Sequence, residues 1–213
     1  MPVNIAISGK ICSGKTTTAQ LISEHWGHAP ITIAEPMYDL ADYIRANEPA
    51  LVFSTIFGLS CGDYTRATKM IRLLTECAAT FKDEIFSGEK PRGFLQALGT
   101  AFKELDEDIW IRPVGEEALV HPERSYVCDD VRYPNEAKWL EECNFRSIRC
   151  VPPENIRMMR IEQLYPSLSE EKLSHISETA LDNYPHFDLL LDTTLPNYKI
   201  MKQLETLLGP PLY

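Results

Sequence analysis

The chain has 213 residues, of which 44% are hydrophobic and 24% are charged, a composition typical of a single globular α/β domain with insertions. Its net charge of −10 opposes binding to nucleic acid or to an anionic membrane, so we expect neither a polynucleotide nor a membrane partner. No apolar stretch reaches the roughly 20 residues of a membrane-spanning helix, and no secretion signal precedes the first predicted strand, which favours a cytoplasmic protein. Six cysteines are scattered without a C-x-x-C pair, which argues against a zinc site or a disulfide framework.

The first motif lies at residues 9–16, directly after an apolar run at residues 3–7. Its sequence, Gly-Lys-Ile-Cys-Ser-Gly-Lys-Thr, matches G-x-x-x-x-G-K-[ST]. The apolar run predicts a buried strand, and residues 15–22 predict the start of a helix. Gly9 and Gly14 permit backbone angles at which successive amides point inward toward phosphate oxygens, at the positive end of that helix. The segment therefore predicts a phosphate-binding loop.

This motif assigns roles to its members. Lys15 is expected to reach the β- and γ-phosphates of ATP, and the Thr16 hydroxyl to be a Mg²⁺ ligand. Cys12 is best interpreted as a small side chain that the loop tolerates. The expected nucleotide-binding residues are Gly9, Lys10, Cys12, Ser13, Gly14, Lys15, Thr16 and Thr17.

Strands and helices alternate along the rest of the chain. We predict strands at residues 31–34, 125–128, 145–151 and 187–192, and helices at residues 37–46, 67–81, 94–105, 135–142 and 198–208. Such alternation is typical of an α/β fold with a doubly wound, mostly parallel sheet, here a P-loop NTPase, whose ligands lie at the carboxyl ends of the strands. The expected single domain has a core at about 1–49, 109–151 and 179–213, a helical insertion at about 50–108 and a lid at about 152–178.

The strand at 125–128 ends in two acids, Asp129 and Asp130. An acid at this place in such folds supports Mg²⁺, often through water. We favour Asp130, because it opens a segment that brings Arg132 and Glu136 to the same end of the sheet. A turn that caps the next helix through Asn135 is the simpler alternative.

Four arginines are distributed as a kinase with two anionic substrates requires. Arg66 lies in the helical insertion, Arg132 follows the strand acids, and Arg157 and Arg160 are three residues apart in the charged segment. Phosphoryl transfer needs such permanently charged, planar donors to hold the acceptor phosphate and to neutralise the moving group. For each arginine taken alone, a surface salt bridge is the simpler interpretation.

Four blocks of this sequence resemble the deoxynucleoside monophosphate kinases of tailed phages, which are related to adenylate kinase. The blocks are the phosphate loop, Leu-Gln-Ala-Leu-Gly-Thr at 95–100 followed by Asp-Ile-Trp at 108–110, Asp-Val-Arg-Tyr-Pro-Asn-Glu-Ala at 130–137, and His-Ile-Ser-Glu-Thr at 175–179. The resemblance spans nearly the whole chain in collinear order. It implies an ATP-holding core, an acceptor-binding arm and a mobile lid, in the host cytoplasm if the gene belongs to a phage.

Carried over by position, the resemblance implies that Arg66, Arg132 and Glu136 face the acceptor and that Gln96 and Trp110 shape its pocket. Glu35, after the second predicted strand, joins this acceptor-binding set. The expected catalytic residues are Lys15, Arg132, Arg157 and Arg160, and the expected metal ligands are Thr16 and Asp130. The chain departs from the family pattern at Met37 and at residues 101–103, Ala-Phe-Lys.

The expected function is ATP- and Mg²⁺-dependent phosphorylation of a deoxynucleoside 5′-monophosphate to the diphosphate. Two alternatives stay open: a kinase of another small acceptor, such as dephospho-coenzyme A or a sugar acid, and a non-catalytic nucleotide-binding switch. The sequence also leaves open whether the chain forms a homodimer. The lid, with few apolar residues to hold it, is expected to be mobile without ligand.

Overall fold

A computed structural model describes residues 3–212, apart from the side chains of residues 171 and 172. The chain divides into two compact units. We call the described part of Met1–Thr32 and Val114–Tyr213 the core unit, and Ile33–Pro113 the helical unit. Each is described by itself below. No helix within the described residues is both long and apolar enough to cross a membrane.

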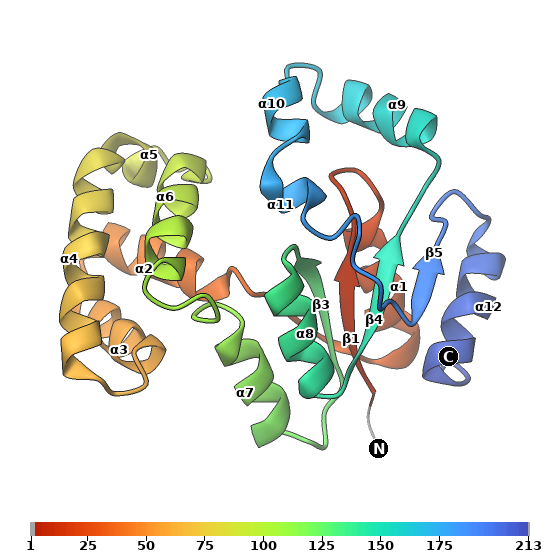
Figure 1. The fold of residues 1–213 in the computed structure, drawn as a ribbon, viewed down its shortest axis with the longest axis horizontal. Coiled ribbons are helices and arrows are strands. Elements are labelled where there is room, and N and C mark those ends of the chain that lie inside the picture. Colours follow the sequence, from red (N-terminus) through yellow and green to blue (C-terminus); the bar gives the residue numbers. More distant parts are fainter. Residues whose placement is uncertain (1–2, 213) are drawn as a thin grey trace. The chain divides into compact units, whose positions relative to one another are not determined.

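The core unit is built on one parallel sheet, and within residues 3–212 that sheet has five strands in the order β2-β3-β1-β4-β5 (Figure 1). The strands are β1 (Asn4–Ser8), β2 (Ala29–Ile31), β3 (Tyr126–Val131), β4 (Phe145–Cys150) and β5 (Leu189–Leu191). All five were predicted, and the predicted doubly wound α/β architecture of a P-loop NTPase is confirmed. Because the strands are parallel, their carboxyl ends meet at one edge, where ligands of such sheets bind.

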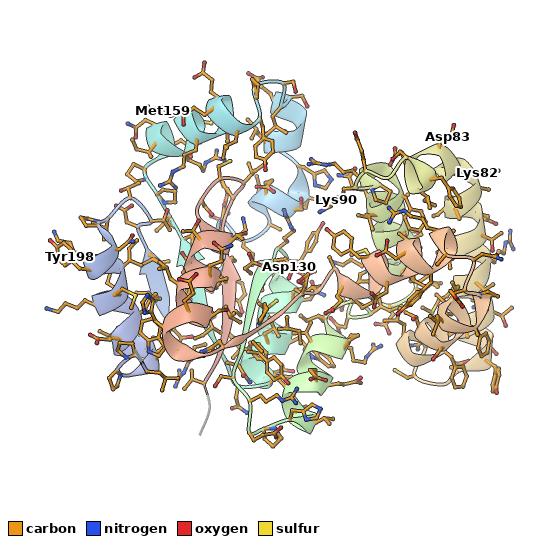
Figure 2. The ribbon with its side chains drawn as sticks, turned by 180° about the vertical axis from the view of Figure 1, so that it is seen from behind. Lys82, Asp83, Lys90, Asp130, Met159 and Tyr198 are labelled. Carbon is orange, nitrogen blue, oxygen red and sulfur yellow. The ribbon has the colours of Figure 1, made fainter. Side chains whose placement is uncertain are left out.

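Helices cover both faces of this sheet, as Figures 1 and 2 show from opposite sides. Ile22 of α1 and Ile200 and Leu204 of α12 pack with Ile5 and Ile7 of β1 in one buried cluster, and α8 covers the opposite face. This burial of aliphatic side chains stabilises the edge that carries the site. The described helices that lie wholly or mostly in the core unit are α1 (Lys15–Trp26), α7 (Arg112–Val120), α8 (Pro134–Glu142), α9 (Glu154–Leu164), α10 (Glu170–Leu173), α11 (Ile176–Thr179) and α12 (Asn197–Leu208).

The helical unit has its own core. Trp110 and Phe102 stack with parallel rings 5.2 Å apart, and both are buried together with Met70 and Leu98. Asp63 caps α4 by accepting from the amides of Thr65 and Arg66, which fixes where that helix begins. The helices are α2 (Glu35–Arg45), α3 (Pro49–Leu59), α4 (Tyr64–Thr80), α5 (Lys82–Phe86) and α6 (Arg92–Lys103).

The structure differs from the sequence prediction at the second strand and at several helices, among them α3, for which no separate helix was predicted. β2 occupies Ala29–Ile31 instead of 31–34, because Ala29 and Ile31 pair with Tyr126 and Cys128 of β3 and α2 already begins at Glu35. The helix α7 was not predicted. The helical unit also includes α2, which the sequence analysis assigned to the core.

Candidate phosphate-binding site

The loop between β1 and α1 closes into a narrow cradle. Gly9 and Gly14 have φ angles of +151° and +92°, a region that residues with a β-carbon rarely adopt. A β-carbon on Gly9 would lie 2.3 Å from Ser13 Oγ, and one on Gly14 would lie 2.9 Å from Cβ and Oγ1 of Thr193. Both glycines are therefore required by backbone angle and by space. The tight turn is the one that the G-x-x-x-x-G-K-[ST] motif predicts for phosphate binding.

Lys15 closes the mouth of the loop. Its Nζ donates to the carbonyl oxygens of Gly9, at 2.7 Å, and Lys10, at 3.0 Å. Burial, followed by the positive charge of Arg132, lowers the pKa of the Lys15 ammonium from its ordinary value. Lys15 is thus a partly buried cation close to a second cation, Arg132. A bound anion such as phosphate would stabilise the charged form of Lys15.

The acid beside the loop is Asp129. The Thr16 hydroxyl donates to Asp129 Oδ2 at 2.7 Å, whereas Oδ1 of Asp130, labelled in Figure 2, accepts from the Cys128 thiol at 3.2 Å. Successive residues of a strand point to opposite faces, so the two acids cannot both face Thr16. The contact with Thr16 therefore favours Asp129 over Asp130 as the metal-supporting acid, and metal binding by either acid stays a prediction.

Thr16 and Asp129 fit a magnesium ion by the chemistry of their donors. A hydroxyl and a carboxylate are the hard oxygen ligands that Mg²⁺ prefers, and it commonly completes its shell with waters and substrate phosphates. Among the described residues there is no group of three or more His, Cys, Asp or Glu side chains that could hold a metal ion. A Mg²⁺ ion at this place would therefore depend on Thr16, Asp129, water and phosphate oxygens.

The predicted lid arginines contact the backbone of the loop. Arg157 is 7% exposed; its Nη1 donates to the carbonyl of Ile11 at 3.2 Å, and its Nε and Nη2 donate to the Glu154 carboxylate. The hydrogen bond to Glu154 raises the pKa of Arg157, so this guanidinium stays charged. Arg157 thus ties α9 to the loop.

Arg160 ties α9 to a second segment as well. Its Nη1 donates to the Cys12 carbonyl at 3.3 Å and to Thr193 Oγ1 at 3.2 Å, and its Nη2 donates to the Thr193 carbonyl. Thr193 in turn donates to the carbonyl of Ser13 at 2.7 Å. The segment after β5 and the helix α9 therefore both support the loop. Contact of Arg157 and Arg160 with a moving phosphoryl group stays a prediction.

Glu178 of α11 lies in the same cluster of cations. Its Oε2 accepts from the amide of Ile11 at 2.5 Å, and its Oε1 accepts from Arg132 Nη1 at 2.6 Å. The Glu178 side chain is 9% exposed and that of Arg132 is 40% exposed. A carboxylate thus occupies one amide of the loop and one guanidinium beside it.

Glu136 has a structural task that the resemblance did not imply. It is 3% exposed, and its Oε2 accepts from the amides of Arg132 and Tyr133, at 2.9 and 3.1 Å. It therefore caps the start of α8, in place of the Asn135 cap that we weighed as an alternative. This burial and capping role favour a structural function for Glu136, and acceptor binding by it stays a prediction.

The remaining predicted acceptor residues belong to the helical unit. Arg66 Nη1 donates to Asp106 Oδ2 at 2.9 Å, and Arg112 donates to the same oxygen at 2.6 Å. Glu35 and Gln96 are exposed. Trp110 is 1% exposed and its indole N–H donates to the Gly99 carbonyl, so it is a core residue and offers almost no surface to a substrate. For Arg66, Glu35 and Gln96, acceptor binding stays a prediction.

Comparison with known proteins supports the fold. No protein-family model and no curated protein matches the chain. Among solved structures, TT1252 from Thermus thermophilus is 19% identical over 98% of this chain and 97% of that chain, with a TM-score of 0.51. An unliganded sugar kinase from Janibacter sp. HTCC2649 is 12% identical over 97% of this chain and 94% of that chain, with a TM-score of 0.48. At 19% identity the likeness to TT1252 supports the fold alone, and nothing is taken from the sugar kinase.

Three residues at the site were missed by sequence reasoning as contributors to it: Asp129, Glu178 and Thr193. The pattern contained a signal for Asp129, since it is one of two acids at the end of a predicted strand. Thr193 follows directly after a predicted strand, at the sheet edge where ligands bind. Glu178 lies in the block at 175–179 that carries the resemblance, but no role was assigned to it, because an acid in the first turn of a helix is common.

Proposed function

We propose that this protein is a kinase that transfers the γ-phosphoryl group of ATP, with Mg²⁺, to a deoxynucleoside 5′-monophosphate and releases the diphosphate. The observation that carries the proposal is the loop Gly9–Thr16, closed by two required glycines, with Lys15 Nζ at its mouth and Thr16 bonded to Asp129. The site carries the proposal, because the fold alone hosts many activities.

On the donor side, the loop amides and Lys15 would bind the β- and γ-phosphates of ATP. Thr16 would hold Mg²⁺ directly, and Asp129 would support it. When bound, Mg²⁺ would neutralise charge on the phosphate oxygens. Lys15 would orient the donor and stabilise negative charge as it develops on the transferring group, an effect that is large where water is excluded.

On the acceptor side, Arg132 and Arg66 are the guanidinium groups that we assign to the monophosphate. Arg132 stands beside the loop with 40% of its side chain exposed, and Arg66 is oriented by Asp106. A planar guanidinium can hold two phosphate oxygens at once, which suits a dianionic acceptor. The monophosphate is itself an anionic nucleophile, so the proposal requires no general base.

The acceptor class rests on the sequence blocks at 95–100, 130–137 and 175–179 that resemble the phage enzymes. The departures at Met37 and Lys103 lie in the helical unit, where base preference and acceptor grip would be set. A nucleotide switch would not need Arg66 and Arg132 for an acceptor phosphate. A kinase of a different small acceptor would use the same donor site, so acceptor choice is the property to measure.

The test is a coupled assay of ADP release with each common deoxynucleoside monophosphate, each ribonucleoside monophosphate, dephospho-coenzyme A and a panel of sugar acids. We expect ADP release that depends on Mg²⁺ and on one or more deoxynucleoside monophosphates. Release with another acceptor class alone would contradict the proposed substrate but keep the kinase. No acceptor-dependent release, together with tight ATP binding, would favour the switch.

Lys15→Ala is the matched control for this assay. The variant should keep its fold, because Lys15 contacts backbone carbonyls on a loop that the glycines, Thr193 and Arg160 also hold. It should lose activity by on the order of 3 kcal/mol in the barrier or more. Near-normal turnover in the folded variant would show that the loop does not hold the donor.

A further inference from the structure

The Glu178 carboxylate lies at a position of the loop where a phosphate oxygen would be expected to bind. Backbone amides of a phosphate-binding loop donate hydrogen bonds to phosphate oxygens. In this structure the Ile11 N–H donates instead to the Glu178 carboxylate, at 2.5 Å. The second oxygen of the same carboxylate accepts from Arg132, the guanidinium assigned to the acceptor, at 2.6 Å. The Glu178 side chain therefore accepts one hydrogen bond from the proposed ATP-binding loop, at Ile11, and one from the proposed acceptor-binding residue Arg132.

The charges around Glu178 explain why it takes this position. Lys15, Arg132 and Arg157 lie near it, and Arg157 also bonds the Ile11 carbonyl. The other acids in this neighbourhood are engaged differently: Asp182 pairs with Lys10 and Arg149, Glu154 pairs with Arg157, and Asp129 accepts from Thr16. The Glu178 carboxylate is thus the acid that supplies negative charge directly to a loop amide.

We infer that Glu178 is an internal substitute for phosphate, which holds the loop and Arg132 in place in the free protein and is displaced when the polyphosphate of the nucleotide binds. The inference rests on the proposed phosphate site. Hydrogen bonds between charged partners are about twice as strong as neutral ones, so displacing this carboxylate subtracts from the observed affinity for phosphate. Glu178 also acts through Arg132, which makes it a positioning residue for the acceptor side.

The inference predicts that phosphate binding becomes tighter when Glu178 loses its charge. In Glu178→Gln the side chain keeps its shape but competes weakly for Ile11 N–H and Arg132. We expect inorganic tripolyphosphate, titrated calorimetrically without Mg²⁺, to bind about tenfold more tightly than to the unchanged protein. If Glu178 only stabilised the loop, Glu178→Gln would bind tripolyphosphate more weakly, because loosening α11 would disorder the loop.

Asp182→Asn is the matched control for charge. Asp182 pairs with Lys10 of the loop at 2.7 Å, yet the structure gives it no contact with a loop amide among the described residues. Removing its charge makes the neighbourhood equally more positive without freeing Ile11 N–H. We expect a gain well below that of Glu178→Gln. Equal gains in the two variants would overturn the inference, because a general electrostatic field would then explain both.

Hydrogen exchange at Ile11 tests the hydrogen bond between Ile11 and Glu178 directly. The Ile11 amide should exchange its hydrogen faster in Glu178→Gln than in the unchanged protein, and tripolyphosphate should restore its protection in both. If Glu178→Gln does not fold, Glu178→Asp serves instead. It retains the charge but is too short to bond both Ile11 and Arg132, so it should bind tripolyphosphate about threefold more tightly. Unchanged or weaker binding in the folded variant overturns the inference.

The unchanged protein and Lys15→Ala separate the two proposals. If the unchanged protein binds tripolyphosphate and Lys15→Ala does not, the phosphate site stands, and the Glu178 variants decide the inference alone. If the unchanged protein binds neither tripolyphosphate nor ATP, and Glu178→Gln does not bind them either, both proposals are overturned.

Discussion

The hydroxyl of Thr16 donates to the carboxylate of Asp129 across 2.7 Å and so joins the first turn of α1 to the end of β3, 113 positions away in the sequence. This contact places the alcohol of the G-x-x-x-x-G-K-[ST] motif against a strand acid. It is the arrangement in which a cation between phosphate and protein can be held by oxygen atoms from two elements of one sheet edge.

We predict that Asp129 matters for Mg²⁺-dependent activity and that Asp130 matters much less. Asp129→Asn should lower kcat by more than about 100-fold, because the supporting charge for the cation is removed. Asp130→Asn, an equal change one residue along, should lower kcat by less than about fivefold if its carboxylate faces away. Steady-state kinetics over a range of Mg²⁺ concentrations measure both. The reverse order of effects would restore our original choice of Asp130.

The pair also shows what a sequence can and cannot predict. The strand and its terminal acids followed from an apolar run that ends in charge, and all five strands were found from their apolar runs. Which of two adjacent acids faces the loop depends on the register of β3 beside β1, and that register shifts between Ala6 and Ser8. A local pattern does not contain that information.

Contacts between distant segments were beyond prediction for the same reason. The spacing of three residues between Arg157 and Arg160 is that of one helical face, and both residues lie on α9. It did not predict that both guanidinium groups bond carbonyls of the loop, or that Glu178 reaches Ile11 across 167 positions. Conversely, the resemblance implied that Trp110 shapes the acceptor pocket, whereas tertiary packing buries its side chain in the core of the helical unit.

We predict that Gly14→Ala destabilises the core unit and abolishes phosphate binding. The substitution would add a β-carbon 2.9 Å from Thr193 at a φ of +92°, and we expect a loss of about 2–4 kcal/mol in unfolding free energy. Gly27→Ala is the control, since its φ of +71° is also left-handed but its neighbour is the end of the flexible Leu212 side chain at 3.3 Å.

The control should cost about 1 kcal/mol and leave phosphate binding unchanged. Urea unfolding of both variants, followed by fluorescence, measures the difference. Equal losses would mean that backbone strain, and not the close approach of Thr193 to the loop, sets the requirement at Gly14.

We predict that the core unit loses stability between about pH 9 and pH 11 through Cys150. Burial raises the pKa of the Cys150 thiol from 9.0 to about 11. In this pH range the unfolded chain gives up the thiol proton while the folded chain keeps it, so the unfolded state is favoured as pH rises. The stability is fully present below pH 9, and about 2 kcal/mol of it should be lost by pH 10.5.

Urea unfolding at pH 8.5 and pH 10.5 measures this loss. Cys150→Ala should be less stable than the unchanged protein at pH 8.5, because a buried side chain is removed, but its further loss toward pH 10.5 should be smaller by about 2 kcal/mol. An identical pH dependence in the two proteins would contradict the assignment to Cys150.

We predict last that residues 152–178 open transiently from the closed state described here, in which Glu178 contacts the loop. Bound ATP, Mg²⁺ and a deoxynucleoside monophosphate analogue should slow this opening, with phosphate taking the place of Glu178 on the loop and on Arg132. This segment is held to the loop by the polar contacts of Arg157, Arg160 and Glu178, while Ile161 is the buried apolar residue of α9 and, within the described chain, α11 buries none. Elements with so little apolar burial open at a low free energy, and ligand contacts can supply the closing energy.

Hydrogen exchange should therefore be fast in 152–178 without ligand and slow with it, whereas amides of α12, anchored by Ile200 and Leu204, should be slow in both states. Protection in 152–178 that equals that of α12 without ligand would identify the segment as a fixed part of the core unit, with Arg157 and Arg160 serving the loop structurally.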